Sequence, residues 1–266
     1  MIRKNRPIPS HQIRLLIFDL DGTLVDSRVD LANSVNAMLR HYGKPELPND
    51  VIASYIGNGA PMLVRRSLGD PDDEKFVQEA LLFFMNYYRE HKLDFTYVYD
   101  GVFPALDAIR ASHETDRAAS RKQASTGIAG RYGLQHLAGH AELKMAVLSN
   151  KPVGPSRGIV DALGLGKYFF QVYGGNSFHT KKPDPAGVQV LLEEAGAHAE
   201  ETVIIGDSDV DIITARNAGI YSVGVMYGLA PHTLADAPPD VLIDHPQELA
   251  DVLGNREQAR LEFKAE

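Results

Sequence analysis

The amino-acid sequence predicts an α/β fold: a doubly wound, Rossmann-like parallel sheet that carries an inserted all-helical cap domain. An unbroken apolar run over residues 13–18 is typical of a strand buried on both faces of a parallel sheet. From residue 143 onward, short apolar runs alternate with helical segments, as they do in βαβ units. Between these two parts, residues 27–96 have helical periodicity and no strand signal. This uninterrupted helical block predicts the cap.

The first predicted strand ends in two acidic residues. Asp19 and Asp21 follow the apolar run, and Gly22 and Thr23 then turn the chain. Residues two apart on an extended segment point the same way, and ligand sites of open α/β sheets lie at the carboxyl ends of strands. Both carboxylates can therefore reach one point, where a divalent cation such as magnesium would relieve their repulsion. A carboxylate can also attack phosphorus while its neighbour moves the leaving-group proton. For the motif taken alone, a solvated turn is the alternative.

The expected cap, residues 27–96, consists of amphipathic helices joined by short breaks. Its helices are expected at 28–43, about 50–56, about 60–68 and about 72–92. Gly57, Asn58 and Gly59 form the break between the second and third helices. Their backbone N–H groups could approach an anionic leaving group, although a simple helix-joining turn explains the glycines equally well.

Arg65 and Arg66 lie on the third expected helix of the cap. One of them could meet a carboxylate of the substrate, although isolated arginines on helix surfaces are most often only solvated. The chain crosses between core and cap near 24–28 and again near 96–101. Two crossings of this kind would allow the cap to close over a substrate by a hinge motion.

The return crossing to the core is expected at 97–104, and a core helix is expected at 102–111. The expected catalytic core therefore comprises residues 1–26 and 97–266, and it surrounds the cap in sequence. The strands that follow are expected at 144–150, 169–175, 202–208, 221–225 and 240–244. Their alternation with helical segments predicts parallel pairing with right-handed crossovers.

Residues 112–142 form an atypical part of the core. They are polar, rich in Ala, Ser and Gly, and longer than an ordinary connection from a helix to a strand. We expect a mobile surface insertion here, with one short helix near 128–138. The last dozen residues, NREQARLEFKAE, are expected to form a solvated helical tail.

Polar residues follow the second core strand as well. Ser149 and Asn150 come directly after the apolar run that ends at Leu148. If the two strands are neighbours, this hydroxyl and this amide lie beside the first carboxylates, where they could hold a phosphoryl oxygen. Taken alone, a serine in such a place is more often a helix cap.

A basic residue stands before the next helix. Lys181 and Lys182 precede Pro183, and a lysine held by the following prolines could neutralise a transferring phosphoryl group. We expect Lys182 to take this position, because it adjoins the proline. A solvated loop is the alternative for a lysine pair.

The strand expected at 202–208 also ends in acid. Asp207 lies at its tip, where it is the natural third metal contact, and Ser208 follows it. Asp211 falls four residues later in the first turn of the next helix. There it could support the metal site, or act only as a favourable charge at a helix N-terminus.

These four groups of residues, here called stations, lie at 19–23, 149–150, 182–183 and 206–211. Together they resemble the motifs of the haloacid dehalogenase-like superfamily of phosphohydrolases, over about residues 13–255 apart from the insertion. Within it, the chain is similar to the phosphoglycolate phosphatase subgroup. That similarity rests on the turn at residues 56–59, on SNKP at 149–152 and on KKPDP at 181–185. The long insertion at 112–142 departs from the family, in which this connection is short.

The resemblance implies a role for each station. Asp19 would be the nucleophile, and Asp21 would be the general acid and then the base. Magnesium, the implied cofactor, would be held by Asp19, by the backbone oxygen of Asp21 and by Asp207. The remaining implied roles are phosphoryl binding by Ser149 and Lys182, with Gly22, Thr23 and Asn150 beside them, and support by Ser208 and by Asp211, which would orient Lys182 or a metal-bound water.

The leading hypothesis is a magnesium-dependent phosphatase that hydrolyses a small phosphomonoester, 2-phosphoglycolate, to glycolate and phosphate through an aspartyl-phosphate. One rival keeps this chemistry with a sugar phosphate, a nucleotide or pyrophosphate as substrate. A β-phosphoglucomutase-like phosphotransferase is a second rival, and a catalytically silent module that binds a phosphorylated metabolite is a third. The presence of Asp21 argues against the silent module and against a dehalogenase, neither of which needs this acid.

The composition limits the classes of partner and bound group that the protein could have. The 266 residues carry a net charge of −8, and a basic excess typical of nucleic-acid or membrane-surface binding is absent. With no cysteine, the chain can form neither a disulfide nor a thiolate zinc site. No apolar run reaches the length of a membrane span or forms a signal peptide, so we expect a cytoplasmic protein. No feature of the sequence indicates an oligomeric state.

Overall fold

A seven-stranded sheet forms the body of the protein. The computed structural model describes residues 1–125 and 142–254, and its sheet has the order β1-β9-β8-β7-β2-β5-β6. The strands are β1 (Arg3–Lys4), β2 (Leu15–Phe18), β5 (Lys144–Leu148), β6 (Gln171–Tyr173), β7 (Thr202–Gly206), β8 (Tyr221–Val225) and β9 (Val241–Ile243). All neighbours are parallel except β1, which pairs antiparallel with β9.

The sheet is wound in both directions from β2. The chain runs from β2 outward through β5 and β6, then crosses to β7 and continues outward through β8 and β9. Strand β2 therefore lies between β5 and β7, and Phe18 is in register with both Val147 and Ile205. The strand order reverses here, and such switch points are where open α/β sheets bind ligands. The predicted doubly wound fold is confirmed.

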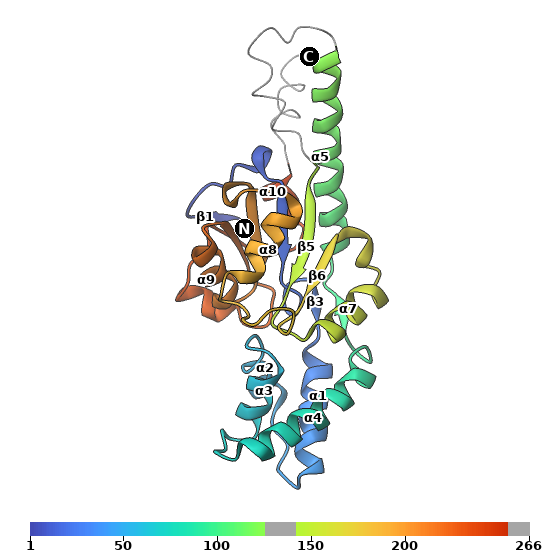
Figure 1. Cartoon of the computed structure of the whole chain (residues 1–266), viewed down its shortest axis with the longest axis vertical. Coiled ribbons are helices and arrows are strands. Elements are labelled where there is room, and N and C mark those ends of the chain that lie inside the picture. Colours follow the sequence, from blue (N-terminus) through green and yellow to red (C-terminus); the bar gives the residue numbers. More distant parts are fainter. Residues whose placement is uncertain (126–141, 255–266) are drawn as a thin grey trace.

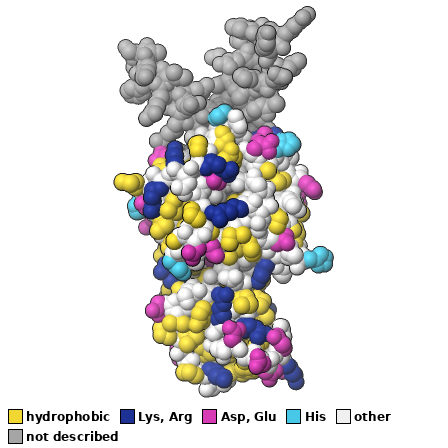
Figure 2. Space-filling model, turned by 90° about the vertical axis from the view of Figure 1, so that its left-hand side faces the viewer, with side chains coloured by type: hydrophobic (Ala, Val, Ile, Leu, Met, Phe, Trp, Pro, Cys, Tyr) yellow, Lys and Arg dark blue, Asp and Glu magenta, His cyan; other side chains and the backbone are white. Residues whose placement is uncertain are grey.

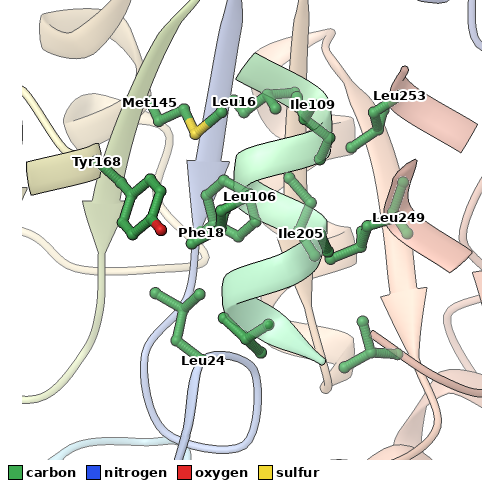
Figure 3. Close-up of a cluster of buried hydrophobic side chains, with 14 of the residues drawn as sticks. Leu16, Phe18, Leu24, Leu106, Ile109, Met145, Tyr168, Ile205, Leu249 and Leu253 are labelled. Atoms are coloured by element: carbon green, nitrogen blue, oxygen red, sulfur yellow. The ribbon is translucent and has the colours of Figure 1, made fainter. Parts of the chain in front are cut away.

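Helices cover both faces of this sheet. They are α5 (Val102–Ser125), α7 (Val153–Ala162), α8 (Ala186–Ala195), α9 (Asp209–Ala218) and α10 (Glu248–Leu253). Leu16 and Phe18 of β2 pack toward α5, where Leu106 lies beside them, and Leu249 of α10 lies on the same face next to Ile205 of β7 (Figure 3). Because side chains alternate along a strand, Leu15 and Ile17 belong to the opposite face, in the cluster with residues of α8 and α9. Both faces of β2 are therefore buried, as its apolar sequence predicts.

Four further helices form a separate layer between β3 and β4. They are α1 (Arg28–His41), α2 (Asn49–Ala53), α3 (Ala60–Ser67) and α4 (Glu74–His91). They have a hydrophobic cluster of their own, in which Val35, Met38, Val64 and Phe84 are fully buried or nearly so. Figure 1 shows these helices gathered beyond one end of the sheet. The four helices lie close to the ranges predicted for them.

Both crossings to this helical layer run side by side. The first contains β3 (Val25–Asp26) and the second β4 (Tyr97–Val98), and the two strands pair antiparallel as a small ribbon. The sequence analysis located the crossings but predicted no strands in them. Two-residue strands are too short to produce a periodic pattern.

Two elements differ from the prediction. Helix α5 continues to Ser125, whereas a helix ending at residue 111 was expected; residues 112–125 contain no glycine or proline that would stop it. Figure 1 shows α5 extending past the sheet on the side away from α1–α4. Strand β1 was not predicted, because its two exposed residues are basic. The short helix expected near 128–138 and the expected helical tail lie outside the described residues.

The surface shows no dominant charge on the face in Figure 2, where basic and acidic side chains are interspersed. Among the residues that the structure describes, no helix is long and apolar enough to cross a membrane.

Candidate active site

The carboxyl ends of three neighbouring strands bring the predicted polar residues together. Asp19 follows β2, Ser149 follows β5 and Asp207 follows β7. The backbone N–H of Asp19 donates to the carbonyl oxygen of Ile205, so the pairing of the two strands continues to this point. The adjacency of these stations follows from the parallel winding about β2.

Lys182 reaches into this group from the loop before α8. Its Nζ lies 2.9 Å from Oδ1 of Asp19 and 2.6 Å from Oδ1 of Asp211, and the side chain is 3% exposed. Burial lowers the pKa of Lys182, but the two carboxylates outweigh it and hold the pKa above its ordinary value. Lys182 is therefore a fixed ammonium between two acids. Lys181 points elsewhere, and its Nζ donates to the backbone oxygen of Asn58 at 2.6 Å.

Three buried carboxylates form a cluster. Oxygen atoms of Asp19, Asp207 and Asp211 all lie within 4.8 Å of one another. The pKa of Asp207 is raised to about 8, because burial and the charges of Asp19 and Asp211 outweigh the backbone N–H donors of Leu229 and Ala230. Burial likewise raises the pKa of Asp19 to about 6, although Lys182 opposes it. Three crowded carboxylates are a donor set that suits a hard divalent cation such as Mg2+.

Gly22 permits the close approach that this cluster needs. Its φ is +87°, and a Cβ at this position would lie 2.1 Å from Oδ2 of Asp207. The neighbouring Thr23 is buried, and its backbone oxygen accepts a hydrogen bond from the Tyr227 hydroxyl at 3.1 Å. The Thr23 hydroxyl itself has no partner among the described residues. The absence of a side chain at Gly22 therefore lets the Asp207 carboxylate lie close to the backbone there.

The start of α9 fixes Asp211. Ser208 is the residue before the helix, and its Oγ and N–H both donate to Oδ2 of Asp211, at 2.8 and 3.3 Å. The other oxygen of Asp211 accepts from Lys182. Both Asp211 and Ser208 are therefore in contact with the cluster, and Asp211 belongs to the set of three carboxylates.

The Asp21 side chain points away from this cluster. Its two oxygens contact Nζ of Lys151 at 3.0 and 2.9 Å, and Ser27 donates a further hydrogen bond. Lys151 is buried, and its ammonium also lies over the ring of Tyr88, 4.6 Å from the centroid. Burial lowers the pKa of Lys151, but Asp21 and Tyr88 hold it above its ordinary value.

The sequence analysis assigned no role to Lys151. It lies in the SNKP stretch, directly after Ser149 and Asn150, and that position was the available signal. Its partners come from distant parts of the chain, however, so no local pattern reveals them.

A pocket separates the sheet from the helical layer. The core contributes Asp19, Asp21, Ser149, Asn150, Lys151 and Pro152, and the helical layer contributes Leu31, Ile56, Gly57, Gly59, Ala60, Leu63, Phe84, Met85 and Tyr88. Nδ2 of Asn150 donates to the backbone oxygens of Gly57 and Lys182, at 3.1 and 3.0 Å. A Cβ on Gly59 would lie 2.9 Å from the backbone oxygen of Asn150. The turn at Gly57–Gly59 thus closes directly onto the polar side of the pocket.

The structure does not bring the two predicted arginines to this pocket. The guanidinium of Arg65 pairs with Glu74 and donates to the backbone oxygen of Pro71 at 2.9 Å, so its donors are used within the helical layer. Neither Arg65 nor Arg66 is among the residues that line the pocket in the described part of the chain. In this arrangement neither arginine faces the pocket, which favours the alternative interpretation that they do not contact the substrate.

Comparison with known proteins agrees with this arrangement. A family model described as haloacid dehalogenase-like hydrolase matches residues 16–126 and 126–225. The chain belongs to this family.

Among curated relatives, phosphoglycolate phosphatase of Pseudomonas syringae pv. tomato is 34% identical over 242 residues, covering 89% of this chain and 78% of the relative. Phosphoglycolate phosphatase of Pseudomonas putida is 35% identical over 241 residues, covering 87% of this chain and 76% of the relative. A solved structure of a predicted phosphoglycolate phosphatase from Haemophilus somnus has a TM-score of 0.73 at 28% identity and covers 91% of this chain and 98% of that one. Within the family, the chain is a phosphomonoester hydrolase similar to the phosphoglycolate phosphatases.

Proposed function

We propose that this protein is a magnesium-dependent, cytoplasmic phosphatase that hydrolyses 2-phosphoglycolate to glycolate and phosphate through a phosphorylated Asp19. The observation that carries this proposal is the contact of Lys182 with Asp19 beside two further buried acids. The named relatives support the choice of substrate. The small pocket above Asp19 is suited to a small phosphorylated metabolite.

In the first step, an oxygen of Asp19 attacks phosphorus and the bond from phosphorus to the ester oxygen breaks. The electron pair of that bond goes to the leaving oxygen, which takes a proton from the carboxyl group of Asp21. Lys182 neutralises charge on the transferring group. Ser149 binds a phosphoryl oxygen through its hydroxyl. Asn150 binds one through its backbone N–H, because both hydrogens of its amide go to Gly57 and Lys182. Gly22 and Thr23 shape the turn below.

In the second step, Asp21 acts as a base. It takes a proton from water, and the resulting oxygen nucleophile attacks phosphorus of the aspartyl-phosphate, releasing phosphate and restoring Asp19. Asp21 lines the same pocket as Asp19, which gives its carboxylate access to both the leaving oxygen and the water.

Asp19, Asp207 and the backbone oxygen of Asp21 would hold magnesium, and Asp211 would support Lys182 next to it. The bound cation supplies charge stabilisation to the transferring phosphoryl group. The carboxylate cluster fits this cation, because three buried acids need positive charge to be ionised together.

We also propose the division into a core, residues 1–26 and 97–266, and a cap, residues 27–96, that closes over the substrate. The separate hydrophobic cluster of α1–α4 and the paired crossings support it. Contacts of the Gly57–Gly59 turn with Asn150 and Lys181 would hold the closed state.

The test is steady-state phosphate release with Mg2+ from 2-phosphoglycolate, sugar phosphates, nucleotides and pyrophosphate. We expect kcat/KM for 2-phosphoglycolate to exceed the others by about a hundredfold. Mass spectrometry of acid-quenched enzyme should find phosphate on the peptide that contains Asp19, and Asp19→Asn should abolish both signals. A preference for another ester would overturn the substrate, and transfer of phosphate to a sugar without release would overturn hydrolysis.

A further inference from the structure

Lys151 is the cation of the pocket. Among the described residues that line the pocket it is the one lysine or arginine, and its side chain is 5% exposed. Lys182 is turned toward the carboxylate cluster, and Arg65 is paired with Glu74. An anionic group that entered the pocket would therefore meet Lys151.

Tyr88 places a second polar group at the same point. This α4 residue is almost fully buried and lines the pocket, and its hydroxyl has no hydrogen-bond partner among the described residues. The Lys151 ammonium lies over the face of its ring. Most of the other cap residues around the pocket are apolar, including Leu31, Leu63 and Phe84. A buried cation beside an unpartnered hydroxyl in apolar surroundings is a suitable site for one carboxylate.

Lys151 can bind a second carboxylate besides Asp21. Its ammonium lies 2.9 Å from Asp21, and an ammonium has three donors to share. The carboxylate of 2-phosphoglycolate is one carbon away from the ester oxygen that Asp21 protonates, so it would arrive next to Lys151.

We propose that Lys151 determines specificity by binding the carboxylate of the leaving group. The proposal rests on the proposed function.

A matched pair of substrates tests this. Ethyl phosphate has the same carbon chain as 2-phosphoglycolate but no carboxylate. The ratio of kcat/KM for 2-phosphoglycolate to that for ethyl phosphate is measured in the wild type and in Lys151→Met, which keeps the apolar stem under Tyr88. We expect the ratio to fall by about 10- to 100-fold, as hydrogen bonds to charged groups predict.

Two matched variants serve as controls. Lys181→Met removes the neighbouring cation at the contact between core and cap, and Arg65→Met removes the cap arginine. Both should leave the ratio within about twofold of the wild type. Both rate constants of the ratio are measured on the same enzyme preparation, so a fraction of misfolded protein lowers both equally and leaves the ratio unchanged. Lys151→Gln provides a second variant. If turnover of Lys151→Met is too slow, calorimetric affinities for both esters in Asp19→Asn and in Asp19→Asn with Lys151→Met give the same comparison.

The outcomes separate the two proposals. A high wild-type ratio that Lys151→Met leaves unchanged, or that Arg65→Met lowers instead, overturns the role of Lys151 and leaves the substrate standing. A wild type that hydrolyses both esters with a ratio near one overturns the substrate and the role of Lys151 together.

Discussion

Asp19, Asp21 and Asp207 each have a different fixed counter-group. Lys182 holds Asp19, Lys151 holds Asp21, and two backbone N–H groups hold Asp207. Two acids at one strand end are thus given different environments although they are two residues apart. Such separation is what a nucleophile and an acid need if they are to act in sequence.

At the residue scale, Gly22→Ala tests the spacing below Asp207. A methyl group would collide with the Asp207 carboxylate in a backbone conformation that already disfavours alanine. We expect a loss of at least about tenfold in kcat/KM and about 1–3 kcal/mol of stability, measured by phosphate release and urea unfolding.

Gly43→Ala is the matched control for this variant. Gly43 also has positive φ, but a Cβ there would meet nothing within 4 Å. We expect it to lose stability through the backbone alone and to keep its activity. Equal losses of activity in both variants would refute the spacing argument.

At the element scale, the ends of strands were predictable and the contacts between distant elements were not. The adjacency of Asp19, Ser149 and Asp207 follows from parallel topology, which apolar runs reveal. Lys151 was missed because its partners Asp21 and Tyr88 lie far away in sequence. The pairing of Arg65 with Glu74 was not predicted for a similar reason, since it depends on how α3 and α4 pack.

The lengths of elements show the same limit. The cap helices have clear apolar stripes and were predicted to within a few residues. The extension of α5 was not predicted, because its polar residues have no apolar period although nothing in them ends a helix. The ribbon of β3 and β4 is fixed by pairing across the crossings, which a single segment cannot show.

Asp30 joins the first cap helix to the returning crossing. Its carboxylate, 1% exposed, accepts from the backbone N–H groups of Phe95 and Thr96 and from the Thr96 hydroxyl at 2.6 Å. Asp30→Asn would turn two hydrogens of an amide toward these donors. We expect about 2–4 kcal/mol less stability by urea unfolding.

Asp73→Asn is the comparison for this prediction. Asp73 caps α4 at an exposed position, through one hydrogen bond from Phe76. Because asparagine also caps helices well, we expect a change below about 0.5 kcal/mol. Comparable losses of unfolding free energy in the two variants would show that the hydrogen bonds of Asp30 to Phe95 and Thr96 do not hold α1 against the returning crossing.

At the scale of the whole molecule, the buried acids couple stability to pH and, in the proposed function, to magnesium. In the metal-free protein, the pKa of Asp207 is raised to about 8, so folding favours its protonated form. This contribution to stability is complete below the ordinary pKa of an aspartate and is lost as pH rises through about 8. Bound magnesium requires the ionised form.

We therefore expect the gain in Tm on adding Mg2+ to grow from about pH 6 to about pH 8.5. Thermal unfolding with Mg2+ and with a chelator measures it. Asp207→Asn should remove most of the pH dependence and most of the Mg2+ effect. A gain that is constant over this range would contradict the coupling.

The paired crossings make the cap an insert that could be exchanged as one unit. Because β3 and β4 run antiparallel and in register, the chain leaves and rejoins the core at adjacent points. Everything between Asp26 and Tyr97 can then be exchanged for another insert with similarly adjacent ends, without altering the path of the sheet. A chimaera that carries the insert of a relative would have new cap residues around the pocket and would keep the core residues Asp19, Asp21 and Ser149. The cap's share of the substrate contacts could accordingly change by replacing one contiguous stretch of chain, while the core would keep its own, Lys151 among them.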